Sequence, residues 1–139
     1  MKNPHKFVIK LRESGLRPTK QRLKICEVLF TPEKTFHFTI SDLTKIIEEK
    51  LAEKISLATV YNTVHAFKKK GYLKEISISS DKSYFDTNTS YHHHFFDIKN
   101  NELIDIHSNS IQLKNTPRPP KGKSIKNVDV IINVENDSQ

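Results

Sequence analysis

The chain has 139 residues, 35% of them hydrophobic and 28% charged, which fits one domain or two very small ones. Its one cysteine, Cys26, excludes an internal disulfide and a structural zinc site made of four cysteines. No apolar run approaches the roughly 20 residues of a membrane span and no signal-peptide pattern opens the chain, so we expect a cytoplasmic protein without membrane contact.

The net charge of +7 is unevenly distributed along the chain. Residues 1–85 contain 17 Lys and Arg against 9 Asp and Glu, whereas residues 86–139 contain 6 against 7. A basic first part indicates contact with a polyanion such as nucleic acid. The chain also lacks a glycine-rich phosphate loop, which argues against nucleotide hydrolysis.

Three helices are predicted in the first 52 residues. A short helix spans Phe7–Leu11 and ends near Gly15. Thr19 can cap a second helix, which Pro32 ends. The segment 39–42 (Thr-Ile-Ser-Asp) has the spacing of a capping box, with Asp in place of the usual Glu or Gln, and begins a third helix over residues 39–52.

The next helix, over residues 57–70, begins after the good N-cap Ser56 and stops at Gly71. An apolar stripe predicted to face the core consists of Leu57, Val60, Tyr61, Val64 and Phe67. The opposite face consists of Ala58, Thr59, Asn62, Thr63 and His65. Such a short, polar face can read bases in a major groove, although an ordinary amphipathic surface helix has the same pattern.

Together, helices 39–52 and 57–70 form a predicted helix-turn-helix. Two short strands, 72–78 and 83–86, then form a hairpin that completes a winged helix, with Lys82 near its tip. Arg17, Lys20 and Arg22 surround the start of the second helix, where cations are unfavourable unless a phosphate lies nearby. Solvated surface charge is the alternative reading of these three residues.

The remainder is predicted to be a second, small domain. We expect strands at 92–98, 102–106 and 125–134, with a turn at Asn100-Asn101 and a proline-rich link before the last strand. Three strands make a poor independent unit, so we expect a homodimer. The predicted fold is α+β: a winged helix-turn-helix domain over 1–86, a linker over 87–91, and a dimerisation and sensing domain over 92–139.

The segment 91–97 (Tyr-His-His-His-Phe-Phe-Asp) is the strongest chemical signal. On a strand His92 and His94 share one face, and Asp86 or Asp105 can add a carboxylate, which is a donor set for Zn, Fe, Mn or Ni. Haem ligation beside the phenylalanines, and a solvated histidine run without a ligand, are the alternatives. Without an HExxH motif or a nucleophile elbow, we do not expect an enzyme.

Three segments in this order resemble the ferric uptake regulator (Fur) family: Leu16-Arg-Pro-Thr-Lys-Gln-Arg22, Ser56-Leu-Ala-Thr-Val-Tyr61 and the run His92–His94. The resemblance extends over about residues 7–134. Four further segments are most similar to the iron response regulator (Irr) branch: Tyr84-Phe-Asp-Thr-Asn-Thr-Ser90, His92-His-His-Phe-Phe96, Glu102-Leu-Ile-Asp-Ile106 and Pro119-Pro-Lys-Gly122.

This resemblance implies a winged helix joined to an α/β dimerisation lobe, and binding of a homodimer, or a dimer of dimers, to a palindromic, A/T-rich operator. The DNA-binding residues implied are Arg17, Lys20, Arg22, Ser56, Thr59, Tyr61, Asn62 and Lys82. A divalent metal (Zn, Fe or Mn) would bind at His37, Asp86, His92, His94 and Asp105. In the Irr branch, haem would bind at His92, His93 and His94.

Three functions follow as hypotheses. The first is a transcriptional regulator of iron and haem homeostasis, and the second is an ordinary metal-activated repressor of the same family. The third, from another class, is a metal-dependent enzyme or a metal buffer with an incidental basic face. Asn62 departs from the family, in which many members have Arg at this position. The two CxxC pairs that hold a structural zinc in many members are absent.

Overall fold

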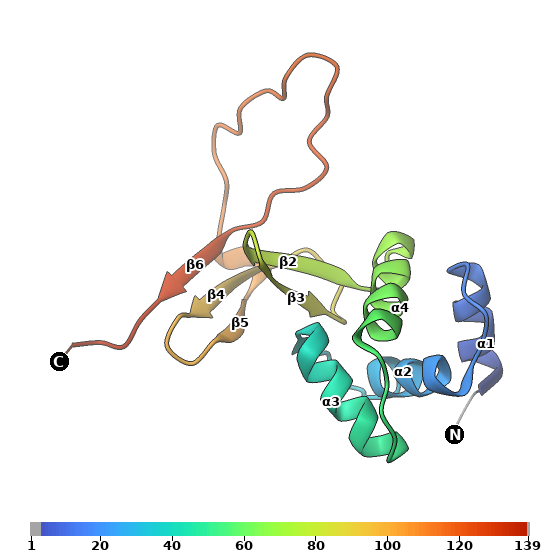
Figure 1. Ribbon diagram of the computed structural model, residues 1–139. Coiled ribbons are helices and arrows are strands. Elements are labelled where there is room, and N and C mark those ends of the chain that lie inside the picture. Colours follow the sequence, from blue (N-terminus) through green and yellow to red (C-terminus); the bar gives the residue numbers. More distant parts are fainter. Residues whose placement is uncertain (1–3, 139) are drawn as a thin grey trace. The chain divides into compact units, whose positions relative to one another are not determined.

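The computed structural model describes residues 4–138 and divides the chain after Thr89 into two compact units (Figure 1). The first contains four helices and a small sheet, and the second contains a small sheet with one short 3-10 helix. This arrangement confirms the α+β class. Among the described residues, no helix is both long enough and apolar enough to cross a membrane.

The four helices of the first unit begin where the sequence places capping side chains; they are α1 Pro4–Glu13, α2 Lys20–Phe30, α3 Ile40–Leu51 and α4 Leu57–Lys70. The Thr19 hydroxyl caps α2, and Thr39 and Asp42 form the predicted capping box of α3. Ser56 caps α4, which ends at Gly71 with φ of 84°, a conformation that glycine adopts without steric cost.

The buried side of α4 differs from the predicted stripe. Val60 and Phe67 are fully buried, as expected, but Leu57 and Tyr61 are 59% and 50% exposed. Thr63, predicted to face outward, is fully buried, and its hydroxyl donates to the Thr59 carbonyl at 2.7 Å. The buried arc is centred on Val60 and Phe67, so Thr63 falls inside it and Tyr61 falls outside.

The sheet of the first unit has the strand order β1-β3-β2. Its hairpin, β2 Lys74–Ser79 and β3 Lys82–Asp86, is the predicted wing. On the other side of β3 lies β1 (His37–Phe38), in which His37 is paired with Asp86. A two-residue strand has no periodicity to recognise, so no strand is predicted at His37 from the sequence.

The second unit is a three-stranded sheet in the order β5-β4-β6, made of β4 His93–Asp97, β5 Glu102–Ile106 and β6 Ile131–Val134. β4 is antiparallel to β5 and parallel to β6. Asn101 has the positive φ expected of the predicted turn.

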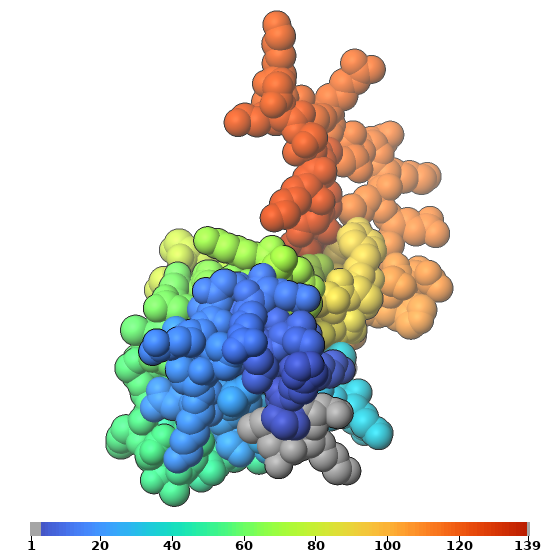
Figure 2. Space-filling model, turned by 90° about the vertical axis from the view of Figure 1, so that its right-hand side faces the viewer, coloured from blue at the N-terminus to red at the C-terminus, as the bar shows by residue number. Residues whose placement is uncertain are grey.

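The strand expected at 125–134 is reduced to its last four residues. Residues 131–134 pair with 94–97, and β4 begins at His93, so β4 has at most one further residue to pair with a longer strand. After the short 3-10 helix Ser108–Ser110, the chain runs as a long open loop to β6 (Figure 1). In the space-filling view the orange side chains of this loop are spread apart, whereas those of the helices pack continuously (Figure 2).

Candidate metal-binding clusters and nucleic-acid interface

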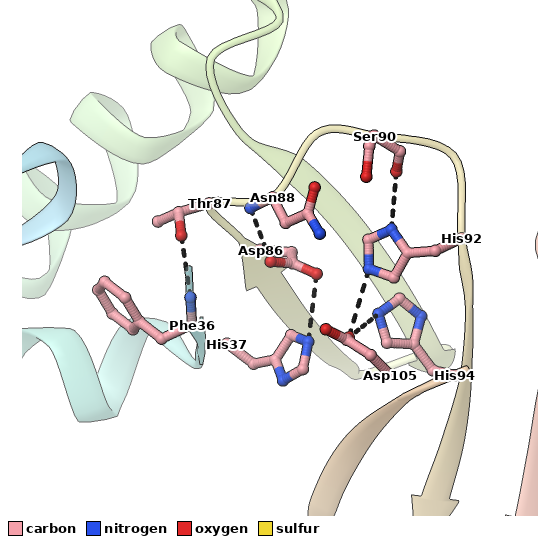
Figure 3. Close-up of polar contacts among 9 residues, drawn as sticks. All are labelled: Phe36, His37, Asp86, Thr87, Asn88, Ser90, His92, His94 and Asp105. Atoms are coloured by element: carbon pink, nitrogen blue, oxygen red, sulfur yellow. Dashed lines mark hydrogen bonds and ion pairs between the residues drawn. The ribbon is translucent and has the colours of Figure 1, made fainter. Parts of the chain in front are cut away.

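A first pair of side chains that could bind a metal ion lies where β1 meets the end of β3. His37 and Asp86 are paired across β1 and β3, and the His37 Nε2 lies 3.1 Å from the Asp86 Oδ2 (Figure 3). The other oxygen of Asp86 accepts the Asn88 amide hydrogen at 2.8 Å, and the side chain is 1% exposed. A buried carboxylate needs such partners, because its desolvation is costly.

The short strand β1 is fastened to the end of β3 by two reciprocal hydrogen bonds. The Phe36 amide donates to the Thr87 hydroxyl at 3.0 Å, and the Thr87 amide donates to the Phe36 carbonyl at 3.2 Å. These bonds flank the His37–Asp86 pair and hold the two backbones in register. The pair is therefore positioned by the backbone of the winged-helix unit itself.

A second cluster lies on one face of the other unit's sheet and contains His92, His94 and Asp105. The ring centroids of His92 and His94 are 4.5 Å apart, and the Nε2 atom of each lies 3.3 Å from the Asp105 Oδ1 (Figure 3). His94 is directly opposite Asp105 in the antiparallel pair β4–β5. One potential ligand atom from each residue lies within 4.8 Å of the others, a spacing that one metal ion can bridge.

The hydrogen bond of His92 to the backbone orients its ring toward Asp105. Its Nδ1 lies 2.7 Å from the Ser90 carbonyl oxygen, which can only accept, so Nδ1 carries a hydrogen. The Nε2 of His92 points toward the Asp105 carboxylate oxygen. A metal ion satisfies both groups at once, and a carbonyl that orients the ligating imidazole is the usual support of such a site.

His93 is not part of this cluster. It points to the opposite side of β4, where its Nδ1 accepts the Val130 amide hydrogen at 3.0 Å. Its ring packs edge-on against Tyr91, with 4.9 Å between centroids, and the residue is 1% exposed. His93 thus fastens the start of β6 to β4, and the structure does not bring it together with His92 and His94.

The predicted DNA-binding residues of α4 fall into two groups. Tyr61 and Asn62 are exposed on the outer face of the helix. Ser56 and Thr59 instead serve the helix terminus, since the Ser56 hydroxyl accepts the Thr59 amide hydrogen at 3.1 Å and lies 2.8 Å from the Thr59 hydroxyl. Ser56 is exposed as well, but its hydroxyl and that of Thr59 are engaged with each other at the helix terminus.

The predicted phosphate-binding side chains differ in their contacts with the rest of the protein. The Arg22 guanidinium donates to the Arg17 carbonyl at 2.9 Å, which fixes it against the segment that enters α2. The Lys20 side chain is 75% exposed, and its ammonium is 3.9 Å from Glu53. Lys82 opens β3 with its ammonium 5.7 Å from the centre of the Tyr84 ring.

Sequence reasoning missed the residues that hold the candidate ligands in place. The Asn88 amide binds Asp86 and the Ser90 carbonyl binds His92. The first of these contacts has a recognisable signal, because an Asp side chain often accepts from the amide two residues later. The second has none, since any residue at position 90 supplies a carbonyl.

The sequence profile described as "Ferric uptake regulator family" matches residues 13–133. The "Peroxide-responsive repressor PerR" of Staphylococcus epidermidis is 33% identical over 100 residues, which are 72% of this chain and 65% of that protein. The "Peroxide operon regulator" of Bacillus subtilis is 36% identical over 97 residues, 70% of this chain and 65% of that protein. The chain therefore matches slightly less than two thirds of the length of these relatives.

Solved structures show the same fold. The ferric uptake regulator of Vibrio cholerae superposes with a TM-score of 0.66 at 26% identity, covering 93% of this chain and 98% of that one. A ferric uptake regulator of Francisella tularensis, solved with iron, gives a TM-score of 0.70 at 18% identity, covering 89% and 94%. At that identity the likeness concerns the fold alone.

Proposed function

Because the chain belongs to the ferric uptake regulator family, we propose that it is a metal-responsive, sequence-specific DNA-binding regulator of transcription and not an enzyme. The observation that carries this proposal is the position of Asp86. It is the last residue of the wing strand β3 and pairs with His37, so two potential metal ligands belong to the winged-helix unit. Metal occupancy can then act on the same unit that reads DNA.

We propose that one ion is shared by His37, Asp86, His92, His94 and Asp105. The pair in the first unit is too small to complete a coordination sphere, and the three donors of the second unit leave room for further ligands. Five residues separate Asp86 from His92, a connection that spans roughly 20 Å at most and so permits a shared site. Imidazole and carboxylate donors suit Zn, Fe or Mn.

For DNA recognition we propose that α4 enters the major groove, with Tyr61 and Asn62 toward the base edges. Phosphate contacts come from the basic residues Arg17, Lys20, Arg22 and Lys82. Ser56 and Thr59 contribute through the helix N-terminus that they cap, where amide groups favour an anion.

A homodimer supplies the two-fold symmetry that a palindromic, A/T-rich operator requires. The second unit supports this proposal, because its small sheet exposes large apolar side chains, including Ile104 at 45% and Ile132 at 39%. A partner copy that covers them would remove this apolar surface from water. Two such dimers on one operator are the alternative assembly.

The finer proposal is a role in iron homeostasis, as the resemblance to the iron response regulators implies. Within it, a metal ion is favoured over haem as the ligand. His92, His93 and His94 are only 5%, 1% and 2% exposed, and one nitrogen of His92 and one of His93 already form hydrogen bonds. A haem would require one of these imidazoles to open toward a macrocycle.

Selection of duplexes from a random pool with zinc-loaded protein tests the proposed function. We expect a palindromic, A/T-rich sequence to be enriched, and its affinity to fall when EDTA removes the metal or when salt is raised. Equal affinity for random duplex would refute the proposal and favour a metal buffer. Adding haemin to the same protein distinguishes the two ligands, because a Soret shift lost in the His92/His93/His94→Ala variant would favour haem.

A further inference from the structure

The exposed ring of Tyr61 is held from one side by a histidine on the same helix. His65 lies one turn further along α4, and the centroids of the two rings are 4.1 Å apart with 35° between their planes. Tyr61 is 50% exposed, whereas His65 is only partly exposed. The contact therefore restrains a side chain that would otherwise sample several rotamers in water.

The other contact of His65 leads into the core. Its ring packs edge-on against Phe85 of β3, with 5.7 Å between centroids and 77° between planes. Phe85 is 2% exposed, stacks on Phe38 of β1 at 5.8 Å, and is paired with Glu75 of β2. His65 thus connects an exposed ring on the helix to a ring that is fixed by the whole wing sheet.

The half-exposed Tyr61 ring borders a cleft. Tyr61, His65, Glu75 and Lys82 all line a cleft of about 400 Å³ between α4 and the wing. On the cleft side, the Tyr61 ring has room to turn. His65 is thus the ring contact that restrains Tyr61 beside this cleft.

We propose that His65 is a positioning residue, which orients Tyr61 for base reading and couples it to the metal-binding end of β3. The coupling would pass through the backbone of β3, because Phe85 immediately precedes Asp86 and one peptide bond joins them. A displacement of Asp86 that accompanies metal binding would shift Phe85, then His65 and then Tyr61. This inference rests on the proposed function.

The DNA part of the test is a double-mutant cycle on His65→Ala and Tyr61→Ala, with the duplex selected by the wild-type protein and saturating zinc. We expect His65→Ala to lower the affinity for that duplex roughly two- to tenfold and to leave the affinity for random duplex unchanged. The double variant should bind no more weakly than Tyr61→Ala. His65→Phe should restore affinity, because its ring can make both contacts and the cleft accommodates its size.

Additive losses in the cycle, or an equal loss on random duplex, would overturn the proposal. Thermal unfolding of each variant separates these effects from misfolding, since His65 is not fully buried and its truncation should leave α4 in place.

A DNA-free measurement separates this inference from the proposed function. Protein labelled with fluorotyrosine gives a ¹⁹F signal for Tyr61 that the Tyr61→Phe variant identifies. We expect zinc to shift this signal in the wild type and in His65→Phe, but not in His65→Ala. If the wild type selects a duplex and zinc shifts its Tyr61 signal, but the signal of His65→Ala shifts as well, only the positioning role is wrong. If the wild type selects no duplex and zinc does not shift its Tyr61 signal, the proposed function fails as well.

Discussion

Replacing Asp86 with Asn tests whether the wing strand contributes a metal ligand. The substitution keeps an oxygen that can accept the Asn88 amide hydrogen, now 2.8 Å away, and removes only the negative charge beside His37. Because a buried charge also carries a desolvation cost, we expect the metal-free variant to unfold at nearly the wild-type temperature. The effect should appear when metal is added.

The expected size of that effect follows from the linkage between binding and folding. Zinc at 100 times its dissociation constant stabilises the wild type by about 2.7 kcal/mol, or a melting shift of about 10 °C for a chain of this length. Removing a residue that merely orients a ligand lowers metal affinity by up to about 100-fold, so removing a direct ligand should lower it by about 100-fold or more. At the same zinc concentration the variant then gains only about 0.4 kcal/mol, a shift of about 2 °C.

Calorimetry of both proteins with zinc and with EDTA measures the two shifts. The matched control is Asp81→Asn, which removes an exposed carboxylate from the same hairpin and should keep the full zinc shift. If Asp86→Asn also keeps the full shift, Asp86 is not a ligand, and the proposed connection between metal and wing is refuted.

Three further predictions concern the exposed residues Tyr61 and Asn62 of α4, the N-cap of α3 and the thiol of Cys26. Tyr61→Phe or Asn62→Ala should weaken binding to the selected duplex by roughly five- to 100-fold. The melting temperature of the protein should stay unchanged, because both side chains are exposed. Fluorescence anisotropy measures the affinity, and a parallel loss of stability would contradict the prediction. Thr39→Ala should cost about 1 kcal/mol of unfolding free energy in urea through loss of its cap, whereas the exposed neighbour Ser41→Ala should be nearly neutral. Burial raises the pKa of Cys26 to about 12 from the usual 9.0, so unfolding free energy should decrease as pH rises from about 9 to 12, because the unfolded thiol ionises first. Alkylation of Cys26 in the native protein at pH 8 as fast as in urea would show that this thiol is not buried.

The parts of the fold that depend on neighbouring residues could be predicted from the sequence. Thr19, Thr39 and Ser56 were recognised as N-caps because a cap acts only on the first turn that follows it. The pairing of His94 with Asp105 could also be anticipated, since a short asparagine turn fixes the register of the two strands.

The parts that depend on distant residues could not be predicted in this way. Nothing near His37 indicates that it pairs with Asp86, 49 positions later, and only resemblance to a family pointed to it as a ligand. The length of β6 is set by its partner β4, and its own alternating side chains predicted a longer strand. Whether Tyr61 lies on the buried or the exposed side of α4 depends on which arc of the helix meets the other helices, and the helical period alone leaves this undecided.

The central claim is that a single ion joins ligands of the winged-helix unit to ligands of the second unit. X-ray absorption spectroscopy of the zinc-loaded protein tests it directly, because the spectrum reports the imidazole and carboxylate donors around the metal. The account predicts three imidazole ligands in the wild type and two in both the His37→Ala and the His94→Ala variants. Zinc coordination that His37→Ala leaves unchanged would contradict it.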